Sequence, residues 1–259
     1  MDLGLTGKVA VVTGASKGIG LAIVRGLAAN GAQVIAGART SSAGLAELVR
    51  AGQVRAIQVD LTRSSGPADL IEQAGDQIDI LVNNVGGAPA RTGGFLSITD
   101  DDWLSTITVN FLAAVRTTRA ALPAMLAAGH GVIVNTGSVN SYLPDPAVMD
   151  YSAAKAALAN FAKALSKEVG PHGIRVNSVS PGPVATDLWL GTTGVAATVS
   201  AATGADPKDV AGQAASQMVT GRFTTPGEVA DLVLFLASER AANITGATFA
   251  IDGGLVQTL

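Results

Sequence analysis

Cysteine is absent from this 259-residue chain, and charged side chains are scarce. Without cysteine there is no disulfide, no thiolate nucleophile and no zinc site built on thiolate ligands. Charged residues make up 14% of the sequence, the formal net charge is −3, and no block of basic residues occurs. Nucleic acids and anionic membrane surfaces are therefore not expected as partners.

Long apolar runs are missing as well. No run approaches the ~18 residues that a membrane-spanning helix needs. The chain begins with MDLGL, which lacks the basic segment and apolar core of a signal peptide. We therefore expect a cytoplasmic protein without membrane association. The scarcity of charge also suggests that part of its surface is covered in an oligomer.

What the sequence does contain is a regular alternation of strand and helix patterns. Hydrophobic residues reach 48% and there are 31 glycines, which is typical of a compact domain with many tight turns. Short apolar runs predict seven buried strands, at residues 8–13, 33–38, 54–59, 77–82, 131–136, 174–179 and 247–251. Since no linker or internal repeat is present, we predict one α/β domain over residues 1–259, with a parallel sheet covered by helices on both faces.

A glycine-rich turn follows the first of these strands. It reads Gly14-Ala15-Ser16-Lys17-Gly18-Ile19-Gly20 and leads directly into a helical pattern that ends at Asn30-Gly31. This arrangement is typical of dinucleotide-binding units, in which the glycines let a pyrophosphate approach the N-terminus of the helix. The ligand crevice of such a sheet lies at the C-terminal ends of its strands. Six residues fall at or just past predicted strand ends: Gly14, Arg39, Asp60, Asn83, Ser138 and Pro181.

The end of the second strand determines the cofactor prediction. The strand ends at Ala38 and is followed by Arg39, where a carboxylate would hold the ribose 2′-hydroxyl of NAD. Lys17 is expected near the same ribose. Two cations without a carboxylate suit a 2′-phosphate, so the sequence favours NADP(H), with NAD(H) as the alternative. Asp60, after the third strand, either caps the next turn or contacts the adenine amino group.

Tyr151 and Lys155 lie four residues apart in a run of helix formers, which places both side chains on one helical face. A tyrosine with an ordinary pKa of ~10 is a poor acid at neutral pH. An ammonium ~4 Å away would contribute ~4 kcal/mol at an effective dielectric of ~20, or ~3 pKa units, and desolvation would oppose this effect. The pair is therefore either an ordinary helix-surface pair or a general acid/base with a pKa near the working pH.

Two further segments bear on the site. A long helix is predicted over residues 100–127, beginning at a Thr99/Asp100 cap, and Asn110 within it needs a hydrogen-bond partner if it is buried. Residues 187–217 are rich in Ala, Gly and Thr with weak periodicity. We predict that this segment is a mobile lid over the site.

The chain as a whole resembles the classical short-chain dehydrogenases/reductases. The resemblance spans nearly the whole length. It rests on TGASKGIG at 13–20, Asp60-Leu61, NNVGG at 83–87, Asn110, Ser138, Tyr151-x-x-x-Lys155, PGPVAT at 181–186 and ITG…IDGG at 244–254. Val85 is a departure, because the family usually has alanine there, and packing is expected to accommodate its extra methyl groups.

This resemblance implies a Rossmann-like doubly wound sheet with strand order 3-2-1-4-5-6-7 and an oxidoreductase that needs no metal. Tyr151 would protonate the carbonyl oxygen of the substrate as hydride arrives from the nicotinamide, or accept a proton in the reverse direction. Lys155 would lower the Tyr151 pKa and bind the nicotinamide ribose. Ser138 would orient the carbonyl, and Asn110 would hold a water that links Lys155 to solvent. The cofactor-binding residues implied are Gly14, Ser16, Lys17, Gly18, Ile19, Gly20, Arg39, Asp60, Leu61, Asn83, Gly86, Tyr151, Lys155, Pro181, Gly182, Val184 and Thr186.

The substrate is less well defined. The candidates to line its site are Val139, Asn140, Leu143, Met149, Leu188 and Trp189. Because these are mostly apolar, a small-molecule ketone or acyl chain is favoured over a sugar phosphate. The chain looks most similar to 3-oxoacyl-carrier-protein reductases, which implies a 3-oxoacyl thioester. An NAD-dependent alcohol, steroid or sugar dehydrogenase and a non-catalytic dinucleotide sensor are the alternatives. The resemblance also implies a homotetramer.

Overall fold

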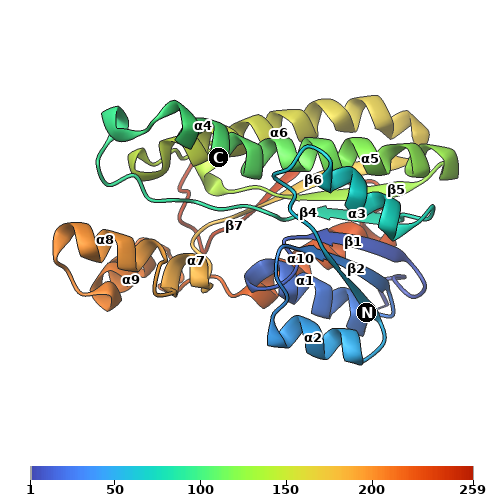
Figure 1. Cartoon of the computed structure of the whole chain (residues 1–259), viewed down its shortest axis with the longest axis horizontal. Helices are drawn as coiled ribbons and strands as arrows, with labels where there is room; N and C mark the ends of the chain where they lie inside the picture. The colour runs from blue at the N-terminus through green and yellow to red at the C-terminus, as the bar shows by residue number, and fades with distance from the viewer. Residues whose placement is uncertain (1, 259) are drawn as a thin grey trace.

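A seven-stranded parallel sheet forms the centre of the computed structural model, which describes residues 2–258 (Figure 1). Its strand order is β3-β2-β1-β4-β5-β6-β7. The strands are β1 (Val9–Thr13), β2 (Gln33–Ala38), β3 (Val54–Gln58), β4 (Ile80–Asn83), β5 (Gly131–Thr136), β6 (Ile174–Pro181) and β7 (Thr248–Ile251). The predicted fold class and strand order are therefore confirmed, with strand ends that differ from the predicted ones by a few residues.

Strand β1 is apolar up to its last residue, Thr13, because helices cover both faces of the sheet (Figure 1). Ala10, Val11 and Val12 in β1 are all 0% exposed. Successive side chains of a strand point to opposite faces. Accordingly, Ala10 and Val12 belong to one hydrophobic cluster and Val11 to the other. A strand buried on both faces shows no polar alternation, which explains the continuous apolar runs in the sequence.

The helices divide into two layers, which Figure 1 shows above and below the sheet. One layer contains α1 (Gly18–Ala29), α2 (Ala43–Arg50) and α10 (Pro226–Ala237). The other contains α3 (Gly66–Ala74), α4 (Asp100–Ile107), α5 (Ala113–Ala128) and α6 (Met149–Val169). Within residues 2–258, no helix combines the length and apolar character that a membrane span requires.

The long helix predicted over residues 100–127 is interrupted. It begins as predicted, with Thr99 and Asp102 forming a reciprocal capping box. A π-helical turn, η2 (Thr108–Leu112), then separates α4 from α5. The Asn110 side chain explains the interruption, because its Nδ2 donates to Thr106 O (3.0 Å), the carbonyl that the N–H of residue 110 would use in an α-helix. Single π turns of this kind are frequent at functional sites.

The segment predicted as a lid is helical. It contains α7 (Asp187–Leu190), α8 (Val195–Thr203) and α9 (Pro207–Ser216), which lie together at one end of the molecule (Figure 1). The sequence pattern did not predict these helices, because the segment is rich in Ala and Thr and has few large apolar residues to define a buried face. The mobility of the segment remains a prediction.

Candidate active site

The side chains of the predicted catalytic set converge where β4 and β5 end and α6 begins. Lys155 is 3% exposed, and its Nζ donates to Thr136 O, at the end of β5, at 2.8 Å. The same Nζ lies 5.6 Å from the centroid of the Tyr151 ring. Ser138 follows β5 directly and is 6% exposed. The chain thus brings a phenol, an ammonium and a hydroxyl to one end of the sheet.

Burial determines the electrostatics of this pair. It raises the pKa of the Tyr151 phenol, and a hydrogen bond with Ser138 opposes this effect without cancelling it. Burial also lowers the pKa of Lys155 to about 8. The expectation that Lys155 lowers the Tyr151 pKa is therefore not met in this geometry. Desolvation penalises the charged forms of both side chains and is larger than the four-residue spacing suggested.

Ser138 is fixed by the short turn that follows it. Its Oγ donates to Asn140 Oδ1 (3.1 Å) and accepts from the backbone N–H of Asn140 (3.2 Å). The Ser141 hydroxyl also donates to Ser138 O at 2.8 Å. The Ser138 hydroxyl is therefore held by two contacts with one residue, which limits the directions in which it can meet a ligand.

Asn110 is paired with the loop after β4. Its Oδ1 accepts the N–H of Gly87 (3.1 Å) and its Nδ2 donates to Gly87 O (2.8 Å). A Cβ on the neighbouring Gly86 would lie 2.9 Å from Asn110 Oδ1 and 3.5 Å from Lys155 Nζ. Asn110, Gly86 and Lys155 are therefore neighbours, and the loop can approach them closely only because residue 86 has no side chain.

The glycine turn after β1 has the backbone geometry of a phosphate cradle. Gly14 adopts φ +66°, and a Cβ on Gly20 would lie 2.2 Å from Gly14 O. α1 begins immediately after Lys17, and within the described chain no side chain caps its first N–H groups. Those N–H groups and the positive end of the helix dipole suit a pyrophosphate. The residues present therefore fit a dinucleotide.

Asn84 supports this turn, and the sequence analysis did not single it out. Its Nδ2 donates to Thr13 O (3.0 Å) and Gly14 O (3.2 Å), which connects β4 to the glycine turn. The neighbouring Asn83 instead donates from its Nδ2 to Thr118 Oγ1 (3.0 Å) and Asn135 Oδ1 (2.9 Å) in the buried interior. The Asn83 side chain is thus hydrogen-bonded away from the glycine turn. If residue 83 contacts the ribose, it would do so through its backbone.

At the adenosine end, Arg39 is exposed, and its backbone O accepts from Gln58 Nε2 at 3.1 Å. Asp60 Oδ1 accepts from the Thr62 hydroxyl (2.7 Å) and N–H (3.0 Å). These hydrogen bonds, with smaller effects from the charges of Arg39 and Arg63, lower the pKa of Asp60. Of the two roles considered for Asp60, this geometry favours capping the turn.

Lys17 is exposed, and its Nζ lies 4.0 Å from Asp187 Oδ2 at the start of α7. Such an exposed pair is a weak constraint, so the ammonium is free to turn toward another anion.

The turn at residues 181–186 lies against the glycine turn. A Cβ on Gly18 would be 3.2 Å from Thr186 Cγ2. Val184 is 4% exposed and pairs with Thr224 through a β-bridge. On the other side of this turn, a Cβ on Gly182 would be 2.9 Å from Asp252 Cβ. These contacts bring the second predicted cofactor segment next to the first.

The residues predicted to line the substrate site differ in exposure. Val139 is 3% exposed, whereas Leu143 and Leu188 are 43% and 44% exposed. Trp189 packs edge-on against Phe223, with ring centroids 5.3 Å apart. Asn140 is engaged with Ser138 through its side chain. The exposed apolar side chains of Leu143 and Leu188 suit contact with a ligand that has apolar parts.

Known proteins resemble this chain over its full length. The sequence model of the short chain dehydrogenase family matches residues 8–193. The 3-oxoacyl-(acyl-carrier-protein) reductase of Escherichia coli is 35% identical over 254 residues, covering 96% of this chain and 97% of that protein. The Chlamydia pneumoniae reductase of the same name is 33% identical, covering 98% and 99%. The L-sorbose reductase of Gluconobacter frateurii, solved with NADPH and L-sorbose, superposes with a TM-score of 0.90 at 35% identity and covers 100% of both chains.

Proposed function

Because this chain belongs to the short-chain dehydrogenase family, we propose that it interconverts a carbonyl and a secondary alcohol with NADP(H), using Tyr151 as the general acid/base. The observation that carries the proposal is the position of Tyr151 and Lys155 beside Ser138, at the sheet edge that also carries the glycine turn. A phenol, a hydroxyl and a buried amine at one point suit proton transfer to a carbonyl oxygen.

The proposed cofactor is NADP(H), which supplies or accepts the hydride when bound. The glycine turn and the N-terminus of α1 would hold its pyrophosphate, and Arg39 with Lys17 would contact a 2′-phosphate. The L-sorbose reductase of similar fold was solved with NADPH, which supports this choice. NAD(H) is the weaker alternative, because no carboxylate directly follows β2 to hold a free 2′-hydroxyl.

In the proposed reaction the Tyr151 hydroxyl donates its proton to the substrate oxygen, and the Ser138 hydroxyl turns from Asn140 Oδ1 to donate a hydrogen bond to that oxygen. Lys155, with a pKa of about 8, is protonated near neutral pH and can supply the proton that the Tyr151 phenolate takes up after the transfer. Its Nζ is held by Thr136 O. Asn110 keeps the loop at Gly87 closed over this amine. In the oxidative direction the Tyr151 phenolate accepts the proton of the alcohol.

The proposed substrate is a 3-oxoacyl thioester. The 3-oxoacyl reductases of similar sequence and the exposed apolar Leu143 and Leu188 support it. A ketose is the second candidate, because the L-sorbose reductase matches this chain along its whole length. We also propose a homotetramer, following the family resemblance, which light scattering in solution would test.

The direct test is NADPH oxidation by the purified protein against a panel of 3-oxoacyl thioesters, diketones, steroids and ketoses. We expect turnover of at least one class, with acyl thioesters ahead of ketoses. NADPH binding without turnover of any carbonyl would instead favour the non-catalytic dinucleotide sensor.

A further inference from the structure

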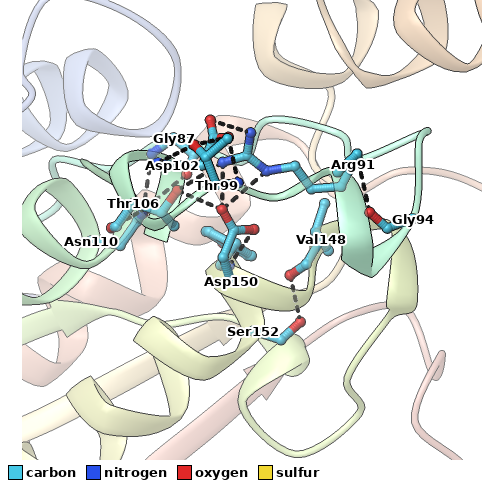
Figure 2. Close-up of polar contacts among 12 residues, drawn as sticks. Gly87, Arg91, Gly94, Thr99, Asp102, Thr106, Asn110, Val148, Asp150 and Ser152 are labelled. Atoms are coloured by element: carbon cyan, nitrogen blue, oxygen red, sulfur yellow. Dashed lines mark hydrogen bonds and ion pairs between the residues drawn. The ribbon is translucent and has the colours of Figure 1, made fainter. Parts of the chain in front are cut away.

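A cluster of charged residues lies close to Asn110, and the proposed chemistry does not use it (Figure 2). Arg91, in the loop between β4 and α4, donates from Nη2 to Asp150 Oδ2 (2.5 Å) and from Nη1 to Asp102 Oδ1 (2.8 Å). The Thr106 hydroxyl in α4 also donates to Asp150 Oδ2, at 2.7 Å. The loop before α4 and α4 itself therefore both meet the carboxylate of Asp150, which lies 59 residues from Arg91 and 44 from Thr106 in the sequence.

The cluster is buried at Asp150 and becomes exposed toward Asp102, whose side chain is 36% exposed. The Asp150 side chain is 0% exposed and that of Arg91 is 15% exposed. Burial alone would raise the pKa of Asp150, but hydrogen bonds from Arg91, Thr106 and the Tyr151 N–H outweigh it and lower this pKa. Asp150 is therefore a buried anion that depends on Arg91, because an unpaired carboxylate is unfavourable in such surroundings.

Asp150 is also the residue immediately before Tyr151. Its Oδ1 accepts the backbone N–H of Tyr151 at 3.0 Å. Val148 occupies the N-cap position of α6, and its apolar side chain makes no capping hydrogen bond. Asp150, in the first turn, accepts one of the free N–H groups instead, and the positive end of the helix dipole stabilises its carboxylate. The N–H of Arg91 donates to Ala147 O (2.6 Å), which ties the loop to the residues that enter the helix.

The same cluster reaches Asn110. Thr106 donates its hydroxyl to Asp150, and its backbone O accepts from Asn110 Nδ2 at 3.0 Å. Figure 2 shows Arg91, Asp150, Thr106 and Asn110 joined in this way. One ion pair is thus linked to two members of the proposed catalytic set, through the backbone of Tyr151 and the side chain of Asn110.

We propose that Arg91 and Asp150 are positioning residues, which fix the first turn of α6 so that the Tyr151 hydroxyl meets the substrate oxygen. The proposal rests on the proposed function of Tyr151. Arg91 acts on the reaction through its contacts with Asp150 and Thr106 and not by touching the substrate. The chemical step then depends on this pair, whereas pyrophosphate binding at the glycine turn, which joins β1 to α1, does not.

The kinetic test compares Arg91→Ala, Arg91→Lys, Arg91→Met, Asp150→Asn and the Arg91→Met/Asp150→Asn double variant with the wild type. Arg91→Ala should lower kcat by ~100-fold, as expected for a displacement of ~1 Å at a reacting group, while the Kd for NADPH and the substrate KM change little. Arg91→Lys should recover part of that loss. The double variant should lose no more than Arg91→Met alone, because both residues act as one unit.

Arg240→Ala is the matched control, since Arg240 is exposed and its Nε donates to Asp2 O, away from the site. It should keep wild-type kcat. If Arg91→Ala does not fold, Thr106→Val tests the proposal instead. Valine keeps the shape of the threonine side chain and removes the hydroxyl that donates to Asp150. Wild-type kcat in folded Arg91→Met or Thr106→Val, or equal losses in kcat and NADPH affinity, would overturn the proposal.

A readout that needs no turnover separates this proposal from the proposed function. The chain contains only two tyrosines, so in a Tyr142→Phe background ultraviolet titration reports Tyr151 alone. Adding the charge-neutral Arg91→Met/Asp150→Asn change should loosen the first turn and bring the Tyr151 pKa down toward its ordinary value. An unchanged titration would refute the positioning proposal, whatever the wild type does with carbonyls. A shifted titration in a protein that turns over no carbonyl would refute only the proposed function.

Discussion

Among glycine-to-alanine substitutions in the glycine turn, Gly20→Ala is expected to distort the backbone at the proposed pyrophosphate site most. The added Cβ would lie 2.2 Å from Gly14 O and 2.5 Å from Asn84 Nδ2. Ordinary contacts are ~3.5 Å, so the turn must move by ~1 Å and the bonds from Asn84 to Thr13 O and Gly14 O must weaken. Overpacking of this kind costs ~1–3 kcal/mol. Where this free energy is lost from the NADPH-binding conformation of the turn, NADPH affinity drops by ~10–100-fold.

The assay is titration of NADPH fluorescence, with thermal unfolding measured in parallel. Gly170→Ala is the matched control, because Gly170 has φ −54° and a Cβ there would meet nothing within 4 Å. It should leave both NADPH affinity and thermal stability close to the wild type. Wild-type NADPH affinity in folded Gly20→Ala would refute the assignment of this turn as the pyrophosphate site.

Two further predictions concern Lys155 and Arg39. Below pH 8 the buried Lys155 is charged in both folded and unfolded states, whereas between pH 8 and 10.5 only the unfolded state keeps its proton. The unfolding free energy of the wild type relative to Lys155→Met should therefore rise by ~3 kcal/mol across that interval in denaturant titrations, and a constant difference would contradict the burial argument. Arg39→Ala should weaken NADPH binding by ~10-fold or more and leave NADH binding unchanged, since only a 2′-phosphate needs the guanidinium; an unaltered NADPH/NADH preference would show the cofactor assignment to be wrong.

The fold was predictable because its central strands are buried on both faces. Residues 9–13 are apolar or β-branched throughout and residues 132–134 read Val-Ile-Val, and such runs are visible without an alignment. The helices at residues 187–217 were not predicted, because α8 reads VAATVSAAT and shows no clear apolar stripe. The π turn at Thr108–Leu112 was missed for another reason: it depends on a side-chain hydrogen bond that competes with the α-helical pattern.

The candidate site was predictable where neighbours in space are also neighbours in sequence. The glycine turn and the Tyr151/Lys155 spacing are local patterns of this kind. The link from Asn84 to Gly14 spans 70 residues, and the pair of Arg91 with Asp150 spans 59. Neither leaves a periodic signal, because each depends on how distant segments pack. The Tyr151 pKa was misjudged for the same reason, since burial is a property of the whole fold.

The most direct test of the central claim is the rate of NADPH-dependent carbonyl reduction by Tyr151→Phe. This substitution removes the hydroxyl and keeps the ring that lies 5.6 Å from Lys155 Nζ. We predict that NADPH binds as it does to the wild type while turnover falls by ~10²–10⁴-fold, the usual contribution of a general acid/base. Turnover by Tyr151→Phe at the wild-type rate would contradict the account, because another group would then have to supply the proton.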